Sequence, residues 1–260
     1  MKTFRIGGVH PAENKLSAAE PIKVAELPKV AVFPMGQHIG APALPVVQKG
    51  DKVKVGTLIA KPMENALSTS IFSSVSGTVL KVDTVVDASG YKKPAVYVSV
   101  EGDEWEESID RSDKLVTLKD KPELTPEQII EKVKNAGIVG MGGACFPTHV
   151  KLMPPPQFKP EWVIINAGEC EPSVTADHRL MLEKADEALV GVELLMKAAK
   201  VAKGFTGIEE NKPDAIKLLT EKCAAQYPNI EVVPLKTKYP QGGEKQLIDA
   251  VVRRQVPAPP

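Results

Sequence analysis

The periodicity of the sequence changes along the chain, and this change most limits the folds open to it. Between Val30 and Val100 short β-type runs are separated by turn residues, and Val96, Val98 and Val100 alternate with polar positions. From Thr125 onward, helical patterns such as TPEQIIEKVKNAG alternate with apolar strands such as WVIINA. The sequence therefore predicts a small all-β unit followed by a parallel sheet flanked by helices, whose ligands lie beyond the carboxyl ends of the strands.

Turn residues and charge runs divide the chain into three expected parts. Residues 1–29 form an irregular arm, rich in glycine and proline, that we expect to pack over another domain. Residues 30–105 form the β domain and residues 114–260 the α/β domain. The acidic stretch EGDEWEESIDRSD, residues 101–113, is expected to be a solvated link between them.

Composition excludes several function classes. Lys+Arg and Asp+Glu are 33 each, so no positive field draws the chain to nucleic acid. No clean apolar run approaches the roughly 20 residues of a transmembrane helix, and no secretory signal opens the chain, which predicts a cytoplasmic location. The three cysteines are widely spaced and are expected to be reduced thiols. Four isolated histidines predict satisfied polar contacts rather than a metal site.

Three loops carry the candidate chemistry. The first, GIVGMGGACFPTHVK, is dense in glycine and lets backbone N–H groups approach a flat or anionic ligand, while Phe146 could stack on a ring and Lys151 could reach a phosphate. The alternative is a tight helix-to-strand connection. His149, four residues after Cys145, also suggests a cysteine–histidine pair, although no third, orienting group is evident.

The other two loops follow expected strands. INAGECEPSVTADHR presents Asn166, Glu169 and Glu171, whose amide and carboxylates suit the polar edge of a flavin and its ribityl chain. KYPQGGEKQLI places Tyr239 and two glycines before a helix, whose free N–H groups suit phosphate or electron-rich ring atoms. We expect all three loops to lie in register on one edge of the sheet.

The β unit resembles the barrel-sandwich hybrid fold of lipoyl and biotinyl carrier domains through VVQKGDKVKVGTLIA and IFSSVSGTVLKV. In carriers, a lysine at the tip of the hairpin between these halves holds the cofactor. Here that stretch is PMENALSTS, without a lysine, and Lys61 lies inside the preceding strand. We therefore interpret the unit as a scaffold.

The loops GMGGACFPTHVKL, INAGECEPSVTADHRLM and YPQGGEKQLI, with GGVHPAENK and GQHIGAPALPVV, resemble the C subunit of the Rnf complex over essentially the whole chain. Rnf is the membrane-associated NADH:ferredoxin oxidoreductase that couples electron transfer to ion pumping. The loops are also similar to the flavin and NADH site of the complex I flavoprotein subunit. The fold implied is a Rossmann-like parallel sheet flanked by helices, preceded by a barrel-sandwich hybrid β domain.

The resemblance implies an FMN held noncovalently on the loop from Gly140 to Ala144, with NADH stacked over the flavin and no acid–base residue required. Lys151 would lie near its polar or phosphate end, Asn166 and Glu169 at the ring or ribityl chain, with Phe146 and Glu171 at NADH, while Tyr239, Gly243 and Glu244 would close the site. The implied cofactor-binding residues are Gly140, Gly142, Gly143, Ala144, Phe146, Lys151, Asn166, Glu169, Glu171, Tyr239, Gly243 and Glu244.

The chain also departs from the patterns it resembles. Cys145 stands at a glycine of the complex I motif GxGGAGF, Met141 at an arginine, and Gly168 at an aspartate that is a flavin contact. The C subunits of Rnf hold two 4Fe-4S clusters through CxxCxxCxxxCP runs, and this chain, ending RRQVPAPP, has none. We expect a fragment without a cluster, its 4Fe-4S region being found only in the full-length family member.

The implied partners are the other Rnf subunits at the cytoplasmic face of the membrane, with ferredoxin reached through the complex. Two alternatives stay open. One is a flavin-dependent cobalamin reductase, which shares the Gly-rich loop. The other is a catalytically silent scaffold whose β unit docks partners.

Overall fold

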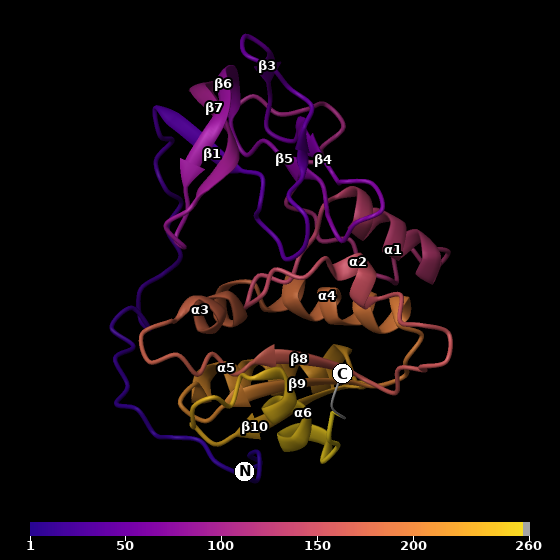
Figure 1. The fold of residues 1–260 in the computed structure, drawn as a ribbon. Coiled ribbons are helices and arrows are strands. Elements are labelled where there is room, and N and C mark those ends of the chain that lie inside the picture. The colour runs from indigo at the N-terminus through magenta and orange to yellow at the C-terminus, as the bar shows by residue number, and fades with distance from the viewer. Residues whose placement is uncertain (257–260) are drawn as a thin grey trace. The chain divides into compact units, whose positions relative to one another are not determined.

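The computed structural model describes residues 1–256, so the last four residues of the expected α/β domain and of RRQVPAPP lie outside the described part. The chain forms two compact units. The β unit comprises Val24–Lys114 and Glu127–Pro155, and the α/β unit comprises Met1–Lys23, Leu115–Pro126 and the residues from Pro156 onward. Both are drawn in Figure 1. The boundaries expected at residues 29, 105 and 114 stay a prediction.

The β unit contains two antiparallel sheets around one core. The first has the order β1 (Val30–Pro34), β7 (Lys92–Gly102), β6 (Ser76–Val86), β3 (Lys52–Val53). The second has the order β2 (Leu44–Pro45), β4 (Leu58–Lys61), β5 (Ile71–Phe72). Met35, Ile59, Val96 and Val98 are fully buried between them, which explains the strict alternation along β7. Lys61 ends β4 and is exposed, in agreement with its expected place in a strand.

The acidic stretch is part of this unit rather than a link. The amide of Val55 donates to the carbonyl of Glu104 at 2.8 Å, and the amide of Glu106 donates back to Val55 at 3.0 Å. Ile109 lies so close to Gly56 that a Cβ there would meet its Cδ1 at 2.1 Å. The stretch is mostly exposed, as expected, but it is not a free link because the backbone of residues 104–106 pairs with the β unit. Acidic side chains give no sign of such backbone pairing.

Helix α1 (Pro126–Asn135) ends as the sequence predicts. Gly137 follows it with a φ of 65°, and the amide of Ile138 closes the end by donating to Val133 at 3.2 Å. A Cβ at Gly137 would also meet the carbonyl of Ser70 at 2.5 Å. The short helix α2 (Thr148–Lys151) lies in the same unit.

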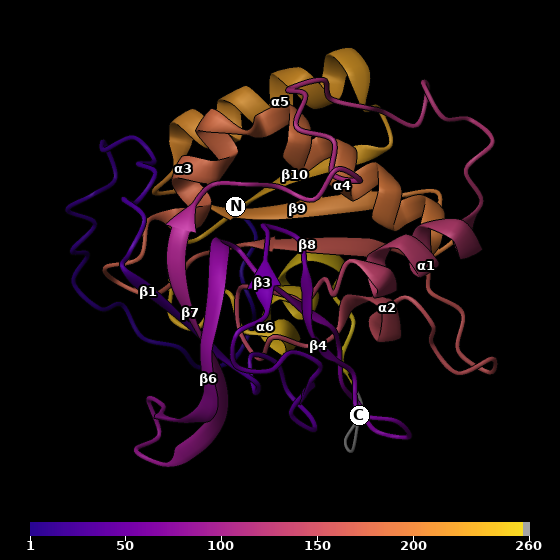
Figure 2. The same cartoon turned by 90° about the horizontal axis from the view of Figure 1, so that it is seen from above.

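The α/β unit has a three-stranded parallel sheet of order β10-β9-β8, which confirms the expected parallel sheet flanked by helices. Its elements follow in alternation, as Figure 2 shows: β8 (Val163–Ala167), α3 (Ala176–Glu183), α4 (Ala185–Ala198), β9 (Gly204–Glu209), α5 (Pro213–Gln226), β10 (Ile230–Leu235) and α6 (Glu244–Val252).

Two cores cover the two faces of this sheet. Leu189 of α4 and Leu219 of α5 pack with Ile208 on one face. Leu247 of α6 packs with Phe205 and other residues on the opposite face. The sheet is thus the middle of three layers, and its carboxyl end is left to loops.

The N-terminal arm lies along the edge of this sheet. Lys2 pairs in parallel with Leu235, and Val9 pairs in antiparallel fashion with Tyr239 through two bonds of 2.8 Å. The arm thus packs over the α/β unit. Within residues 1–256, no helix has the length and apolarity needed to cross a lipid bilayer.

Candidate functional site

The carboxyl end of the parallel sheet brings together two of the three predicted loops. The side-chain amide of Asn166, at the end of β8, donates to the carbonyl of Gly242 at 2.7 Å. Its oxygen accepts from the amide of Gly168 at 3.2 Å, and the amide of Gly242 donates to the Cys170 thiol sulfur at 3.3 Å. Residues 166–170 and 239–243 therefore form one joined surface, as their places after β8 and β10 predict.

Gly168 is required for this joint. A Cβ at Gly168 would lie 3.1 Å from the Cα of Gly242 and 3.3 Å from its nitrogen. Both groups belong to the backbone and have little freedom to move. Any side chain at position 168 would therefore require the two loops to shift apart by a few tenths of an ångström.

Glu169 combines a left-handed backbone with a buried carboxyl group. Its backbone has a φ of 50°, and its side chain is only 1% exposed. Oε1 accepts a bond of 2.6 Å from the amide of Asp177, whereas the buried Oε2 has no hydrogen-bond partner among the described residues. Burial raises the pKa of this carboxyl, although Lys212 and Lys15 oppose the shift. A buried acceptor with free capacity fits a polar ligand or an ordered water.

Two residues of this site were missed by sequence reasoning, Glu209 and Lys212. Lys212, 1% exposed, donates to the carbonyl of Gly168 and to Asn211 Oδ1, both at 2.9 Å. Its Nζ is 3.9 Å from one oxygen each of Glu169 and Glu209. Burial lowers the pKa of Lys212 and raises that of Glu209. The run EENK, which begins at the last residue of β9, was the available signal, because it falls at the carboxyl end of a strand.

Lys15 was also missed. Its ammonium, from the N-terminal arm, donates to the carbonyls of Glu169, Glu171 and Val174 at 2.8, 2.9 and 2.6 Å. It therefore fixes the loop after β8 from outside the sheet. The stretch GGVHPAENK, in which it lies, was the only sequence signal.

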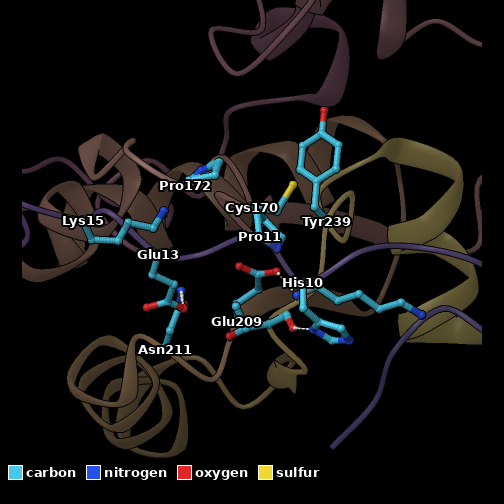
Figure 3. A pocket seen from close by; sticks show the side chains of 11 residues that line it. His10, Pro11, Glu13, Lys15, Cys170, Pro172, Glu209, Asn211 and Tyr239 are labelled. Carbon is cyan, nitrogen blue, oxygen red and sulfur yellow. Dashed lines mark hydrogen bonds between the residues drawn. The ribbon is translucent and has the colours of Figure 1, made fainter.

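A small cavity lies beside these groups in the α/β unit. It has a volume of about 190 Å³, and its lining includes Lys15, Cys170, Glu209 and Tyr239. Figure 3 shows the Glu209 carboxylate in the middle of the labelled side chains. Because ligand pockets usually measure about 300–1,000 Å³, this cavity is too small for a flavin or a dinucleotide.

The start of α6 has free donors. Gly243 is its N-cap residue, and no side-chain cap bond is found there within the described residues. The first N–H groups of the helix and the positive end of its dipole are thus available to an anion or an electron-rich ring. Tyr239 and Glu244 are exposed at either side of this turn, and Glu171 is exposed on the neighbouring loop.

The Gly-rich loop belongs to the β unit. The amide of Gly140 donates to Phe146 and that of Thr148 to Ile138, both at 3.0 Å, so the loop is closed at its base. The tight helix-to-strand connection is wrong, because α2 follows. No described atom of this unit lies within 4 Å of a Cβ built on Gly142 or Gly143. This open backbone surface fits a flat ligand.

The left-handed backbone of this loop falls on Cys145, with a φ of 50°, and not on Gly140, Gly142 or Gly143. This conformation is one that glycine adopts more readily than a residue with a side chain. The Cys145 thiol donates weakly to the carbonyl of Gly143 at 3.7 Å. Gly142 and Gly143 therefore leave the space above the backbone open, and neither of them is needed for a left-handed φ.

The remaining predicted residues of this loop are accessible to different degrees. Ala144 and Lys151 are exposed, and Phe146 is half-buried. The Gly-rich loop lies in the β unit and the other two loops in the α/β unit, so their meeting in one site stays a prediction.

The four histidines mostly make polar contacts. His10, His38 and His178 each have a partner, His178 contacting Asp214 at 2.8 Å. The expectation is wrong for His149, whose Nδ1 is buried without a partner in the described part of the chain, and burial lowers its pKa. No group of three or more His, Cys, Asp or Glu side chains able to hold a metal occurs within residues 1–256.

Comparison with known proteins defines the class to which these two units belong. Residues 133–260 match the model of the Nuo51 FMN-binding domain, and residues 2–103 match that of the RnfC barrel sandwich hybrid domain. Residues 2–103 are thus of the barrel-sandwich hybrid type, and residues 133–260 are of the complex I FMN-binding type. The chain belongs to the family of Rnf complex C subunits.

Two relatives illustrate the similarity. The chain is 45% identical over 260 residues to the C subunit of the proton-translocating ferredoxin:NAD(+) oxidoreductase complex of Clostridium ljungdahlii, covering 99% of this chain and 55% of the relative. It is 45% identical over 258 residues to the Na(+)-translocating counterpart of Acetobacterium woodii, covering 98% of this chain and 56% of that protein. The chain thus spans about half the length of these curated relatives.

A solved structure also matches. An NAD+-reducing NiFe hydrogenase in the air-oxidized state is 25% identical, with a TM-score of 0.42, over 48% of this chain and 23% of that one.

Proposed function

We propose that this chain is the electron-entry part of an ion-translocating ferredoxin:NAD oxidoreductase, binding FMN and accepting hydride from NADH. The observation that carries the proposal is the joint between Asn166 and Gly242, because it unites two predicted flavin loops at the carboxyl end of a parallel sheet. The match of residues 133–260 to an FMN-binding domain supports it. In this proposal the three-stranded sheet is the Rossmann-like core of the flavin domain.

The residues of the α/β unit would bind the polar parts of the flavin. The buried Glu169 carboxylate, with one oxygen free of described partners, would accept from ring or ribityl donors. The uncapped N-terminus of α6 after Gly243 would present N–H donors to an electron-rich edge. Tyr239, in the loop before this helix, and Glu244, its first residue, would cover the site.

The residues of the β unit would bind the flavin through their own open backbone and one lysine. The open backbone at Gly142 and Gly143, with Gly140 and Ala144 at its ends, would allow a planar ring to approach closely. Lys151, exposed at the end of α2, would bind the phosphate as a point charge. Phe146 and Glu171 would contact the dinucleotide.

The chemistry needs no acid–base residue from the protein. Bound FMN would supply the capacity to take a hydride from NADH and to release electrons singly, and the chain's residues would position the two ligands and exclude water. The buried polar groups around Glu169 suit the exclusion of water, because they stabilise charge without admitting solvent.

The proposal extends to the assembly. Electrons would pass to 4Fe-4S clusters of the full-length family member and to ferredoxin through the complex. Partner Rnf subunits would hold the chain at the cytoplasmic face of the membrane.

Anaerobic titration tests the proposal. The purified chain is mixed with FMN, binding is followed by quenching of flavin fluorescence, and NADH is then added. The expected result is one FMN per chain and bleaching of flavin absorbance by NADH faster than for free FMN. A chain that is folded by circular dichroism but leaves flavin fluorescence and the bleaching rate unchanged would contradict the proposal and favour the silent scaffold.

A further inference from the structure

The N-terminal arm contacts the loop after β8 through consecutive residues. The amide of Asn14 donates to the carbonyl of Pro172 at 3.0 Å, and the hydroxyls of Ser17 and Thr175 lie 2.8 Å apart. Between them, the Lys15 ammonium donates to three carbonyls of this loop at 2.6 to 2.9 Å. All three donor positions of one ammonium are therefore used on a segment of six residues.

This arrangement is more than a surface contact. The Lys15 side chain is 14% exposed and also lies 3.9 Å from Glu169 Oε2. The segment it binds contains Glu169, whose left-handed backbone is costly for a side-chain-bearing residue and needs external support. On the other side, Lys212 holds the preceding carbonyl, that of Gly168, at 2.9 Å. Two ammonium groups thus bracket Glu169.

We propose that Lys15 is a positioning residue of the candidate site: its ammonium holds the 169–174 segment in the conformation that presents Glu169 and Glu171. This inference rests on the proposed function for its consequence, flavin affinity, but the positioning itself is independent of flavin. The N-terminal arm is then a part of the site, supplied from far outside the FMN-binding domain in sequence.

The chemistry of the contact dictates the variants. Lys15→Met keeps the length of the side chain and removes every donor, whereas Lys15→Arg keeps charge and several donors. Lys23→Met is the matched control, because Lys23 lies on the same arm, its side chain is 77% exposed, and its ion pair is with Glu20, at 3.5 Å, on the arm itself.

Hydrogen–deuterium exchange of the 260-residue chain without flavin reads the positioning directly. In Lys15→Met, peptides spanning residues 168–177 should exchange at least about tenfold faster than in Lys23→Met, because bonds to a charged donor are among the stronger ones. Lys15→Arg should restore most of the protection. Equal exchange of this segment in Lys15→Met and Lys23→Met would overturn the proposal.

Two further readouts complete the test. Trp162 fluorescence, in a Trp105→Phe background, shows whether the α/β unit of Lys15→Met is folded. If that unit is not folded, Lys15→Gln replaces Lys15→Met in the same comparison. The FMN dissociation constant should rise about tenfold in Lys15→Met and recover in Lys15→Arg; an unchanged constant would overturn the link to the site. If the wild-type chain binds no FMN, the proposed function fails, and the exchange result still decides the role of Lys15.

Discussion

The side-chain amide of Asn166 donates to the carbonyl of Gly242 at 2.7 Å, across 76 residues of sequence. The same side chain accepts from Gly168, so one amide holds its own turn and the turn before α6 together. This relationship makes Asn166 an organiser of the loops as well as a candidate ligand, and the two roles can be separated by measurement.

Replacing Asn166 by alanine should destabilise the α/β unit. Loss of the bonds to Gly242 and Gly168 should lower the free energy of unfolding by about 1–2 kcal/mol and weaken FMN binding. Urea unfolding followed by Trp162, in a Trp105→Phe background, measures the first effect. Exposed Asn229 provides the control, since Asn229→Ala should change neither quantity. Equal stability of the two variants would show that the joint contributes nothing.

Gly168→Ala should be more damaging than a surface glycine change. The added Cβ would sit 3.1 Å from the Cα of Gly242, so the loops must separate at a cost of about 1–3 kcal/mol. The same Trp162 unfolding experiment measures this loss. A stability within about 0.5 kcal/mol of wild type, the range of neutral surface changes, would mean that the loops move apart freely.

Gly142→Ala separates binding from folding. Its new Cβ would meet no described atom of the β unit within 4 Å, so unfolding followed by Trp105 in a Trp162→Phe background should be unchanged to about 0.5 kcal/mol. The methyl group would stand where the flavin ring approaches, and the FMN dissociation constant should rise about tenfold. Undiminished FMN affinity would remove this loop from the proposed site.

Substitutions of Cys145 test whether its left-handed backbone is strained. Alanine at this position keeps the Cβ that disfavours a φ of 50°, whereas glycine removes it. Cys145→Gly should therefore be more stable than Cys145→Ala by about 1 kcal/mol, in spite of the greater freedom of glycine in the unfolded chain. Urea unfolding with Trp105 as the probe gives the order of the two variants, and the reverse order would contradict the strain argument.

Glu209 should make stability depend on pH. Burial raises its pKa above the ordinary value of 4.5, so the folded carboxyl keeps a proton that the unfolded one loses. The resulting stabilisation is complete below pH 4.5 and is lost as the pH rises through the folded pKa. Wild type should therefore lose stability relative to Glu209→Gln from pH 4.5 toward neutrality, by about 1.4 kcal/mol per unit of pKa shift.

The control for Glu209 is exposed Glu221 on α5. Stability of Glu221→Gln, measured by Trp162 unfolding at a series of pH values, should run parallel to wild type. A parallel course for Glu209→Gln as well would contradict a raised pKa for Glu209.

Much of the architecture was predictable from the sequence because it rests on local patterns. The helix from Pro126 ends before Gly137, and the alternating apolar runs predicted the order of strands and helices in the α/β unit. The place of the Asn166 and Tyr239 loops followed from one rule about parallel sheets. These features depend on residues near one another in the chain.

The features that the sequence did not predict depend on partners far away along the chain. Lys15 is 154 residues from Glu169, and nothing local distinguishes it from a solvated lysine. Glu209 and Lys212 are buried charges, which are rare and are read from sequence as surface. The acidic stretch after Gly102 pairs through its backbone, which side-chain charge does not reveal. Sequence patterns thus found the loops but not the charges that hold them.

The pairing of Lys2 with Leu235 has a consequence for biosynthesis. A ribosome makes the arm long before it makes β10, and Lys2 Nζ donates to the carbonyl of Val251, 249 residues further on. Because the arm precedes β10 in the chain, it cannot make these contacts until β10 and α6 have been translated and folded. Once docked, the arm covers part of the exposed edge of β10 and so hinders edge-to-edge pairing with other molecules.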